Sequence, residues 1–310
     1  MNAGEIHELI LNIGAAERET GLSKDVLRMW ERRYGFPNPV RNDNGEREYA
    51  LADIAKLRAI KRLMDAGLRP GKVIGLSIAD LDALADAHTP RHRDAAGPAL
   101  EHGTLALLKA HDPAALRQTL SQWLMRQGLG QFVVDTLAPL NRAVGIAWMR
   151  GELEVFEEHF YTEQVQATLR TGINAFPRGH GSPRVLLTTL PGEQHGLGLL
   201  MVEALLVCEG AQCVALGTQT PQEDVRRAAA AHRSDIVALS FSTAFPLRQA
   251  TDGLAALRRA LPQDVALWAG GEITRRVRAA LPGIVLLPDL ATALSALRAW
   301  RAHFAASSRT

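Results

Sequence analysis

The stretch Arg184-Val-Leu-Leu-Thr-Thr-Leu-Pro-Gly-Glu-Gln-His-Gly-Leu-Gly198 indicates the fold more strongly than any other part of the chain. It begins with an apolar run of strand length and ends in an E-x-H-x-x-G cluster, formed by Glu193, His195 and Gly198. Such a cluster arises by chance often enough to carry little weight alone. Its spacing from later small residues is more informative, because residues 199–239 separate it from Ser240 and residues 243–269 separate Ser242 from Gly270-Gly271.

Apolar strands alternate with helical stretches after Pro183, which predicts a parallel sheet with crossover helices. Strands are predicted at 184–190, 211–216, 235–241, 264–269 and 284–287, with helices between and after them. Five such units predict a flavodoxin-like, doubly wound domain of Rossmann type, in which ligands bind beyond the carboxyl ends of the strands. The E-x-H-x-x-G cluster, the two serines and the two glycines all follow predicted strands, so they are expected at one edge of the sheet.

This spacing resembles the cobalamin-binding signature of corrinoid proteins, in which the histidine ligates cobalt from below. The resemblance makes His195 the lower axial ligand of a cobalamin, and Glu193 the partner that fixes its tautomer. It also predicts a narrow slot for the cofactor's dimethylbenzimidazole, lined by Gly198, Ser240, Ser242, Gly270 and Gly271. Ser242 departs from the usual leucine, which is expected to loosen one wall. The alternative is that His195 is a polar loop residue and that the glycines only close turns.

The preceding part of the chain divides into three segments. With 310 residues, 47% of them hydrophobic, the chain is too long for one ordinary core. Residues 1–76 alternate short helices and turns, 77–99 is predicted to be a linker, and 100–180 is predicted to form a four-helix bundle. The sheet domain is assigned to 181–305. Asp112-Pro113 supplies a helix start within the bundle, and helices are expected to break near Gly128-Leu-Gly130 and Gly151.

The first segment predicts a winged helix-turn-helix. Two helices flank Gly21, Ser23 caps the second, and Leu22, Val26, Leu27 and Trp30 form its buried stripe. Asn44-Gly45 predicts a two-residue hairpin, the wing. The run Trp30-Glu-Arg-Arg-Tyr-Gly-Phe-Pro37 is similar to the MerR family, in the variant associated with CarH/LitR-type regulators.

The MerR resemblance implies that the second helix enters the DNA major groove. Arg28 is expected to read a base, and Lys24 lies on the same outward face. Arg41, Arg47 and Tyr49 are expected to hold phosphates and the wing. Arg32 and Arg33 could equally pair with Glu31 or Glu19.

Trp148, followed after nine residues by Glu158-His159, forms a W-x9-E-H pattern within the predicted bundle. It resembles the cap over the upper face of cobalamin in CarH/LitR-type regulators, where these residues surround an adenosyl group. Light-sensing members of that type have a histidine directly after the tryptophan, and this chain has Met149. Thioether sulfur is a poor ligand for oxidised cobalt, so His159 or water could take that position, or light could be no part of the signal.

The charge and composition of the chain limit the classes of protein to which it can belong. The formal net charge of +2 is close to neutral, so bulk charge does not indicate a nucleic-acid binder. No membrane span or signal peptide is evident, since the apolar run Leu197–Cys208 is short and carries Glu203. Cys208 and Cys213 are expected to be reduced. We therefore expect a cytoplasmic protein with no membrane partner.

The chain as a whole resembles a CarH/LitR-type regulator. It is expected to be a repressor, not an enzyme, that binds adenosylcobalamin, a double-stranded DNA operator and further copies of itself as a dimer or tetramer. Light would release it from DNA. Two alternatives remain: a regulator that senses cobalamin without light, and a corrinoid methyl-carrier protein of a methyltransferase.

Overall fold

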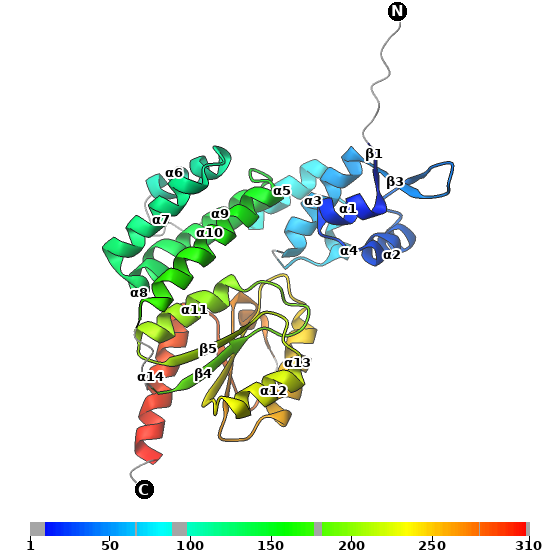
Figure 1. Cartoon of the computed structure of the whole chain (residues 1–310). Coiled ribbons are helices and arrows are strands. Elements are labelled where there is room, and N and C mark those ends of the chain that lie inside the picture. Colours follow the sequence, from blue (N-terminus) through cyan, green and yellow to red (C-terminus); the bar gives the residue numbers. More distant parts are fainter. Residues whose placement is uncertain (1–9, 66, 89–97, 177–181, 279, 308–310) are drawn as a thin grey trace, which may run out of the picture. The chain divides into compact units, whose positions relative to one another are not determined.

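The computed structural model describes residues 10–65, 67–88, 98–176, 182–278 and 280–307 (Figure 1). The chain divides into two compact units, one made of residues 1–92 with 146–152 and the other of residues 93–145 with 153–310. Within the described residues, no helix is long and apolar enough to cross a membrane.

The first unit is a small helical domain with a three-stranded antiparallel sheet in the order β1-β3-β2. Its elements are β1 (Ile10–Asn12), α1 (Ile13–Thr20), α2 (Lys24–Tyr34), β2 (Val40–Arg41), β3 (Arg47–Ala50), α3 (Leu51–Asp65), α4 (Pro70–Val73) and α5 (Ile78–His88). The predicted helix-turn-helix and wing are therefore confirmed as α1-α2 and the β2-β3 hairpin.

Local chemistry explains where α2 begins and ends. The Ser23 hydroxyl accepts the Val26 amide as the predicted cap, and Gly35 closes the helix at φ 67°. One face of α2 is buried through Leu27 and Trp30, which join the core of the unit together with Leu22. Lys24 and Arg28 on α2 are exposed, because apolar residues that recur with the period of a helix leave the other positions to face solvent.

Helix α5 corrects the predicted linker over 77–99. Ser77 and Asp80 form a reciprocal cap at its start, with the Asp80 amide donating to the Ser77 hydroxyl and the Ser77 amide donating to the Asp80 carboxylate. Leu81 is 1% exposed in the core of the first unit. The linker prediction failed because low apolar periodicity concealed one deeply buried leucine; residues 89–97 lie outside the described residues.

We expect Leu81→Ala to destabilise the first unit by about 3 kcal/mol, because truncating a buried leucine leaves a cavity. The matched control is Ile78→Ala on the same helix, where the side chain is 44% exposed and a change within about 0.5 kcal/mol is expected. Urea denaturation followed by circular dichroism measures both. Equal, small effects would show that α5 does not pack on this domain.

The second unit begins with the predicted helical bundle. Its helices are α6 (Pro98–Lys109), α7 (Pro113–Gln127), α8 (Leu129–Gln131), the π-helix η1 (Phe132–Leu137), α9 (Ala138–Met149), whose residues from Ile146 on belong to the first unit, and α10 (Val155–Asn174). Asp112 caps α7 with Pro113 at its first position, and breaks fall at Gly128 and Gly151, as predicted. The π-helical turn was not predicted, because nothing in its sequence differs from an ordinary helix.

The sheet of the second unit is parallel and has the order β5-β4-β6-β7-β8, which is the flavodoxin-like order. Its elements are β4 (Arg184–Thr188), α11 (Leu197–Cys208), β5 (Gln212–Gly217), α12 (Gln222–Ala231), β6 (Ile236–Ser240), α13 (Leu247–Ala260), β7 (Ala266–Gly270), the 3-10 helix η2 (Glu272–Arg276), β8 (Ile284–Leu287) and α14 (Leu290–Ser307). All five predicted strands are confirmed to within two residues at each end.

Alternating side chains of the strands form two separate cores. On β6, Val237 and Leu239 pack with α12 and α13, whereas Ile236 and Ala238 pack with α11 and α14. Figure 1 shows these helix pairs on opposite faces of the sheet. A strand buried on both faces has to be apolar throughout, which is why the sequence shows continuous apolar runs here.

One crossover differs from the prediction. The segment after β7 forms only the five-residue η2, not an α-helix. Its start is fixed by Gly271, whose φ is +106° and whose missing side chain lets the backbone of Phe241 approach closely. The chain thus turns sharply at the carboxyl end of β7, where Gly270 pairs with Ser240 of β6.

Gly271→Ala is expected to destabilise the second unit by about 3 kcal/mol or more, since a Cβ would overlap the carbonyl oxygen of Phe241 at a φ that L residues avoid. Gly145→Ala is the control, because that helical glycine has open space around it. The control should be neutral or stabilising by up to about 1 kcal/mol. Urea titration by circular dichroism compares them, and equal stabilities would contradict the close approach.

Candidate functional site

The loop between β4 and α11 presents Glu193 and His195 at the carboxyl end of the sheet. The Glu193 amide donates to the Leu190 carbonyl at 3.0 Å, which tightens the loop, and Gly192 takes a φ of 87°. Helix α11 then starts at Leu197 with Gly196 as its N-cap residue. The histidine is therefore held on a short, well-braced loop directly before a helix.

The Glu193 carboxylate joins two loops that are far apart in the sequence. It is 1% exposed, and its Oε1 lies 2.7 Å from His195 Nδ1 and accepts the His195 amide at 2.9 Å. Its Oε2 accepts both the amide of Ser242 at 2.7 Å and its hydroxyl at 2.8 Å. Each carboxylate oxygen therefore has two partners, one oxygen serving the histidine and the other the loop after β6.

The charge of Glu193 follows from these contacts. Burial is the largest single influence and favours the neutral acid, but the hydrogen bonds from His195 and Ser242 together outweigh it and lower the pKa of Glu193. A carboxylate facing Nδ1 favours the tautomer with hydrogen on Nδ1. In that tautomer Nε2 carries the lone pair, which is the form a metal ion requires.

Ser242 has a different role from the one the sequence predicted. A serine in place of leucine was expected to loosen one wall of the slot, but its hydroxyl and amide both donate to Glu193. Leucine at this position would keep the amide donor and lose the hydroxyl. This contact was not predicted, because the sequence alone does not show that the side chain turns toward the buried carboxylate.

Several small residues pack closely together beside the loop that carries His195. A Cβ on Gly198 would lie 3.3 Å from the Ser240 hydroxyl oxygen, and Ser240 pairs with Gly270 across β6 and β7. Gly271 leaves no room for a side chain against Phe241. Larger side chains at these positions would therefore disturb the packing of strands and helix, and the slot for dimethylbenzimidazole that these residues are predicted to line remains a prediction.

Thr189 was missed by sequence reasoning. Its fully buried hydroxyl donates to the Glu193 carbonyl at 2.6 Å and accepts the Gln219 amide at 2.8 Å. Thr188 beside it donates to the Gly217 carbonyl at 2.9 Å. Two threonines ending an otherwise apolar strand were the available signal, and they tie the histidine loop to the loop after β5.

The coordination chemistry also fits a corrinoid. Within the described residues, no group of three or more His, Cys, Asp or Glu side chains could hold a metal ion. The side chain that would hold the cobalt of a corrinoid is His195, because its Nδ1 faces the Glu193 carboxylate and its Nε2 would be the nitrogen that binds the metal. The residues present therefore fit a cobalamin.

The residues predicted for the upper face occupy two helices. Trp148 and Met149 end α9 and are half-buried, whereas Glu158 and His159 lie on the first turns of α10. Glu158 accepts the Thr162 hydroxyl at 2.8 Å, and His159 is 72% exposed with its Nε2 3.8 Å from the Glu158 carboxylate. Their roles toward an adenosyl group remain predictions.

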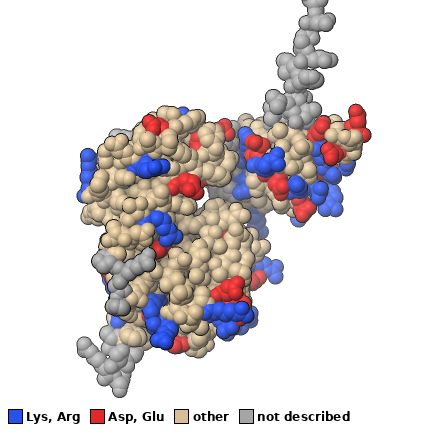
Figure 2. All heavy atoms as spheres, viewed as in Figure 1, with Lys and Arg blue, Asp and Glu red and all other residues tan. Residues whose placement is uncertain are grey.

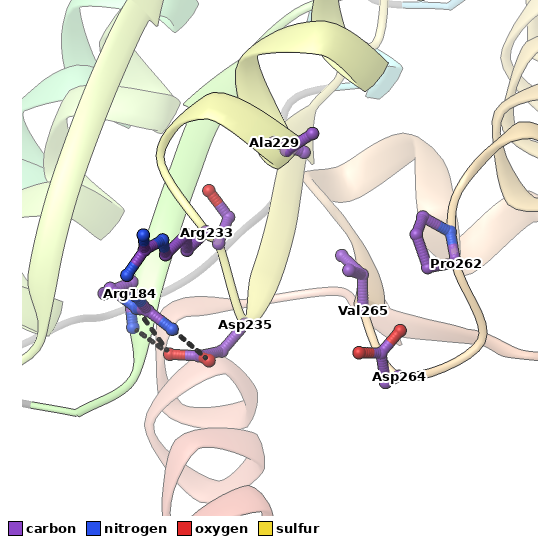
Figure 3. Close-up of a pocket in the computed structure, with 9 residues that line it drawn as sticks. Arg184, Ala229, Arg233, Asp235, Pro262, Asp264 and Val265 are labelled. Carbon is purple, nitrogen blue, oxygen red and sulfur yellow. Dashed lines mark hydrogen bonds and ion pairs between the residues drawn. The ribbon is translucent and has the colours of Figure 1, made fainter.

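A depression in the surface lies at the opposite end of the sheet from His195 (Figure 3). It measures about 260 Å³ and is lined by residues that precede the strands, among them Arg184, Arg233, Asp235 and Asp264. Arg184 and Asp235 bond to each other at 3.2 Å, so they hold together the starts of β4 and β6. This depression does not belong to the site around His195.

The predicted DNA-binding side chains lie on α2 and the wing. Arg28 is exposed and 3.3 Å from Asp25, and Lys24 lies 3.7 Å from Glu17. Arg41 donates to the Gly45 carbonyl at 2.7 Å within the hairpin. Figure 2 shows acidic and basic side chains interspersed over this part of the chain, which agrees with the balanced charge of the sequence.

Two wing residues have structural roles. Tyr49 is fully buried in the core, so its side chain cannot reach a phosphate in this structure, and the prediction of a DNA contact was wrong for it. The Arg47 Nε donates to Glu31 at 2.7 Å, which ties the wing to α2. Glu31 and Glu19 are thus paired with Arg47 and Arg58, not with Arg32 or Arg33.

Comparisons with known proteins agree with this geometry. Residues 11–77 match the MerR HTH family regulatory protein description, and residues 100–171 and 183–296 each match a B12 binding domain. The HTH-type transcriptional repressor CarH of Myxococcus xanthus is 33% identical over 283 residues, covering 86% of this chain and 91% of that protein. The repressor CarA of the same organism is 29% identical, covering 75% and 77%.

Among solved structures, the monomethylamine corrinoid protein of Methanosarcina barkeri is similar to 64% of this chain and 96% of that chain, with a TM-score of 0.50. At 16% identity this likeness concerns the fold alone. A MerR-type DNA-binding head joined to a B12-binding module defines a regulator class. The chain belongs to the family of the HTH-type transcriptional repressor CarH.

Ser242→Ala is expected to weaken cobalamin binding about tenfold, because a hydroxyl that orients the buried partner of the metal ligand is lost. The control is Ser295→Ala, where the hydroxyl donates only to Ala291 of its own helix. Titration with hydroxocobalamin, followed by absorption, measures both dissociation constants. Unchanged affinity in the Ser242 variant would show that Glu193 needs no hydroxyl donor.

Proposed function

We propose that this chain is a cobalamin-dependent transcriptional repressor that binds its operator through α2 and the wing. The observation that carries the proposal is the buried bridge from Ser242 through Glu193 to His195, in a chain that also has a MerR-type DNA-binding head. A carboxylate fixed on the far nitrogen of an exposed imidazole is the arrangement of a metal-ligating histidine.

Each part of the site has a defined task in this proposal. His195 presents Nε2 to cobalt, Glu193 holds the ring in the binding tautomer, and Thr189 and Ser242 hold Glu193. Gly198, Ser240, Gly270 and Gly271 border the slot for dimethylbenzimidazole. Trp148, Glu158 and His159 face the upper ligand.

Adenosylcobalamin is the proposed form of the cofactor, and when bound it supplies a light-sensitive cobalt–carbon bond. Cofactor binding favours a conformation in which copies of the chain associate, and the oligomer, a dimer or tetramer, holds several DNA half-sites. If the bound cofactor lost its upper ligand, the chain would lose that preference and release DNA. The differential affinity of the cofactor for the two states is what shifts the equilibrium.

Met149 favours a second candidate function, a regulator that senses cobalamin without light. A thioether is softer than oxidised cobalt prefers, so Met149 is not expected to replace a lost upper ligand. In this alternative His195 still binds cobalt and the chain still binds DNA, but illumination leaves the DNA complex unchanged. The two candidates share the lower face and differ only above the corrin.

His195→Ala should weaken cobalamin binding by at least about 100-fold, beyond the range for loss of an outer-shell partner, and abolish the absorption spectrum of histidine-ligated, base-off cobalamin. Gln194→Ala changes the exposed neighbour and should bind normally. Absorption titration with adenosylcobalamin in the dark measures both. A normal histidine-ligated spectrum in His195→Ala would refute the axial assignment.

A combined chromatography and gel-shift experiment distinguishes the light-dependent and light-independent functions. With adenosylcobalamin in the dark, size-exclusion chromatography should show a larger species than the cofactor-free protein and a retarded operator fragment. Green light should reverse both if light is the signal. Assembly that persists under light would favour the light-independent regulator, and no assembly in the dark would refute the oligomer mechanism.

A further inference from the structure

Helix α10 begins with a buried acidic residue that has no part in the roles described so far. Glu157 is 3% exposed and lies on the first turn of this 20-residue helix. Buried carboxylates are rare in proteins unless they are paired. The partners of Glu157 therefore indicate what this side chain does.

Three groups from two segments converge on Glu157. Its Oε2 lies 2.7 Å from Lys109 Nζ and accepts the Glu154 amide at 2.7 Å, while its Oε1 lies 3.2 Å from His111 Nε2. Lys109 ends α6, and His111 follows in the connection to α7 with a φ of 52°. The His111 ring also packs on Phe156, with centroids 5.2 Å apart.

These contacts fix the charge and the position of the turn. Burial is the largest influence and opposes ionisation, but Lys109, the Glu154 amide and His111 together lower the pKa of Glu157. A carboxylate at a helix N-terminus is also favoured by the helix dipole. Glu154 and Glu157 complete a capping box, so the cluster pins the start of α10 to the end of α6.

Glu158 and His159 are the next two residues and share this turn. Since an α-helix rotates about 100° per residue, the inward direction of Glu157 sets the directions of both. Glu158 bonds to Thr162 and lies near His159, and all three residues are on α10. Such bonds within one helix cannot fix where its first turn stands, whereas the bonds of Glu157 to the α6–α7 connection can.

We propose that Glu157, held by Lys109 and His111, is a positioning residue that orients Glu158 and His159 so that the chain distinguishes cobalamins by their upper ligand. The inference rests on the proposed function, because it takes Glu158 and His159 as the groups that face that ligand. A ligand with hydroxyls and ring nitrogens, such as adenosyl, gains hydrogen bonds from a fixed carboxylate and imidazole. A methyl ligand has no group to accept or donate them.

Comparing the binding of two cofactors distinguishes this positioning role of Glu157 from simple stabilisation of the fold. Adenosylcobalamin and methylcobalamin share the lower face, so the ratio of their dissociation constants reports only on the upper side. In Glu157→Ala, adenosylcobalamin affinity should fall about tenfold, as for the loss of one hydrogen bond to a charged group. Methylcobalamin affinity should stay within about twofold.

The matched control is Glu163→Ala, which removes the same charge from an exposed site further along α10 and should leave both affinities unchanged. Lys109→Met keeps the carboxylate and the capping box but removes the strongest tie to α6, so it should shift the ratio in the same direction. It also serves if Glu157→Ala does not fold. Glu157→Gln keeps an acceptor for the Glu154 amide and should fall between Glu157→Ala and the unaltered protein.

Absorption titrations in the dark give every dissociation constant. A wild-type ratio in Glu157→Ala and Lys109→Met, or an equal loss of both affinities, would overturn the positioning role while leaving the proposed function intact. If the unaltered chain binds neither cobalamin, or binds both without using His195, the proposed function fails and this inference fails with it.

Discussion

The hydrogen-bonded carboxylate of Glu193 is the constraint on which the site depends. It is buried at the carboxyl end of the sheet, and a buried charge is tolerated only where its hydrogen bonds are complete. Its four donors come from His195 and Ser242, which follow β4 and β6. Removing the donors of either residue would leave part of the Glu193 charge unpaired, so the loops after β4 and β6 are stabilised together. The His195 side chain is thereby held in place by the protein itself.

The fold positions this interaction in a simple way. Because β4 and β6 are neighbours in the sheet, the loops that follow them meet at one edge. The small residues Gly198, Ser240 and Gly271 allow close packing beside the histidine loop, and Thr189 fastens that loop through its hydrogen bond to the Glu193 carbonyl. A second buried carboxylate, Glu157, braces the start of α10 by the same principle.

The DNA-binding head uses charge differently. Arg47 and Arg58 are committed to Glu31 and Glu19, so part of the basic content of this domain holds the domain together. Among the exposed side chains, Arg28 and Lys24 also lie close to acidic residues. A head with this balance is expected to bind a single half-site weakly, since nonspecific affinity follows the number of phosphates neutralised. Binding by several copies would compensate for this.

The sequence by itself determined the strands, the helix-turn-helix and the positions of His195 and Glu193, because these depend on local period, capping and fixed spacing. Through that spacing it also placed Ser240, Gly270 and Gly271 at the same edge of the sheet as His195. Only the tertiary structure decided what the side chains contact: the hydroxyl of Ser242 on Glu193, the burial of Tyr49, the pairing of Arg47 with Glu31, and the packing of Leu81 that makes a helix of an expected linker. Each of these contacts involves a partner distant in sequence, and the hydrophobic periodicity of the chain does not show which distant residues meet.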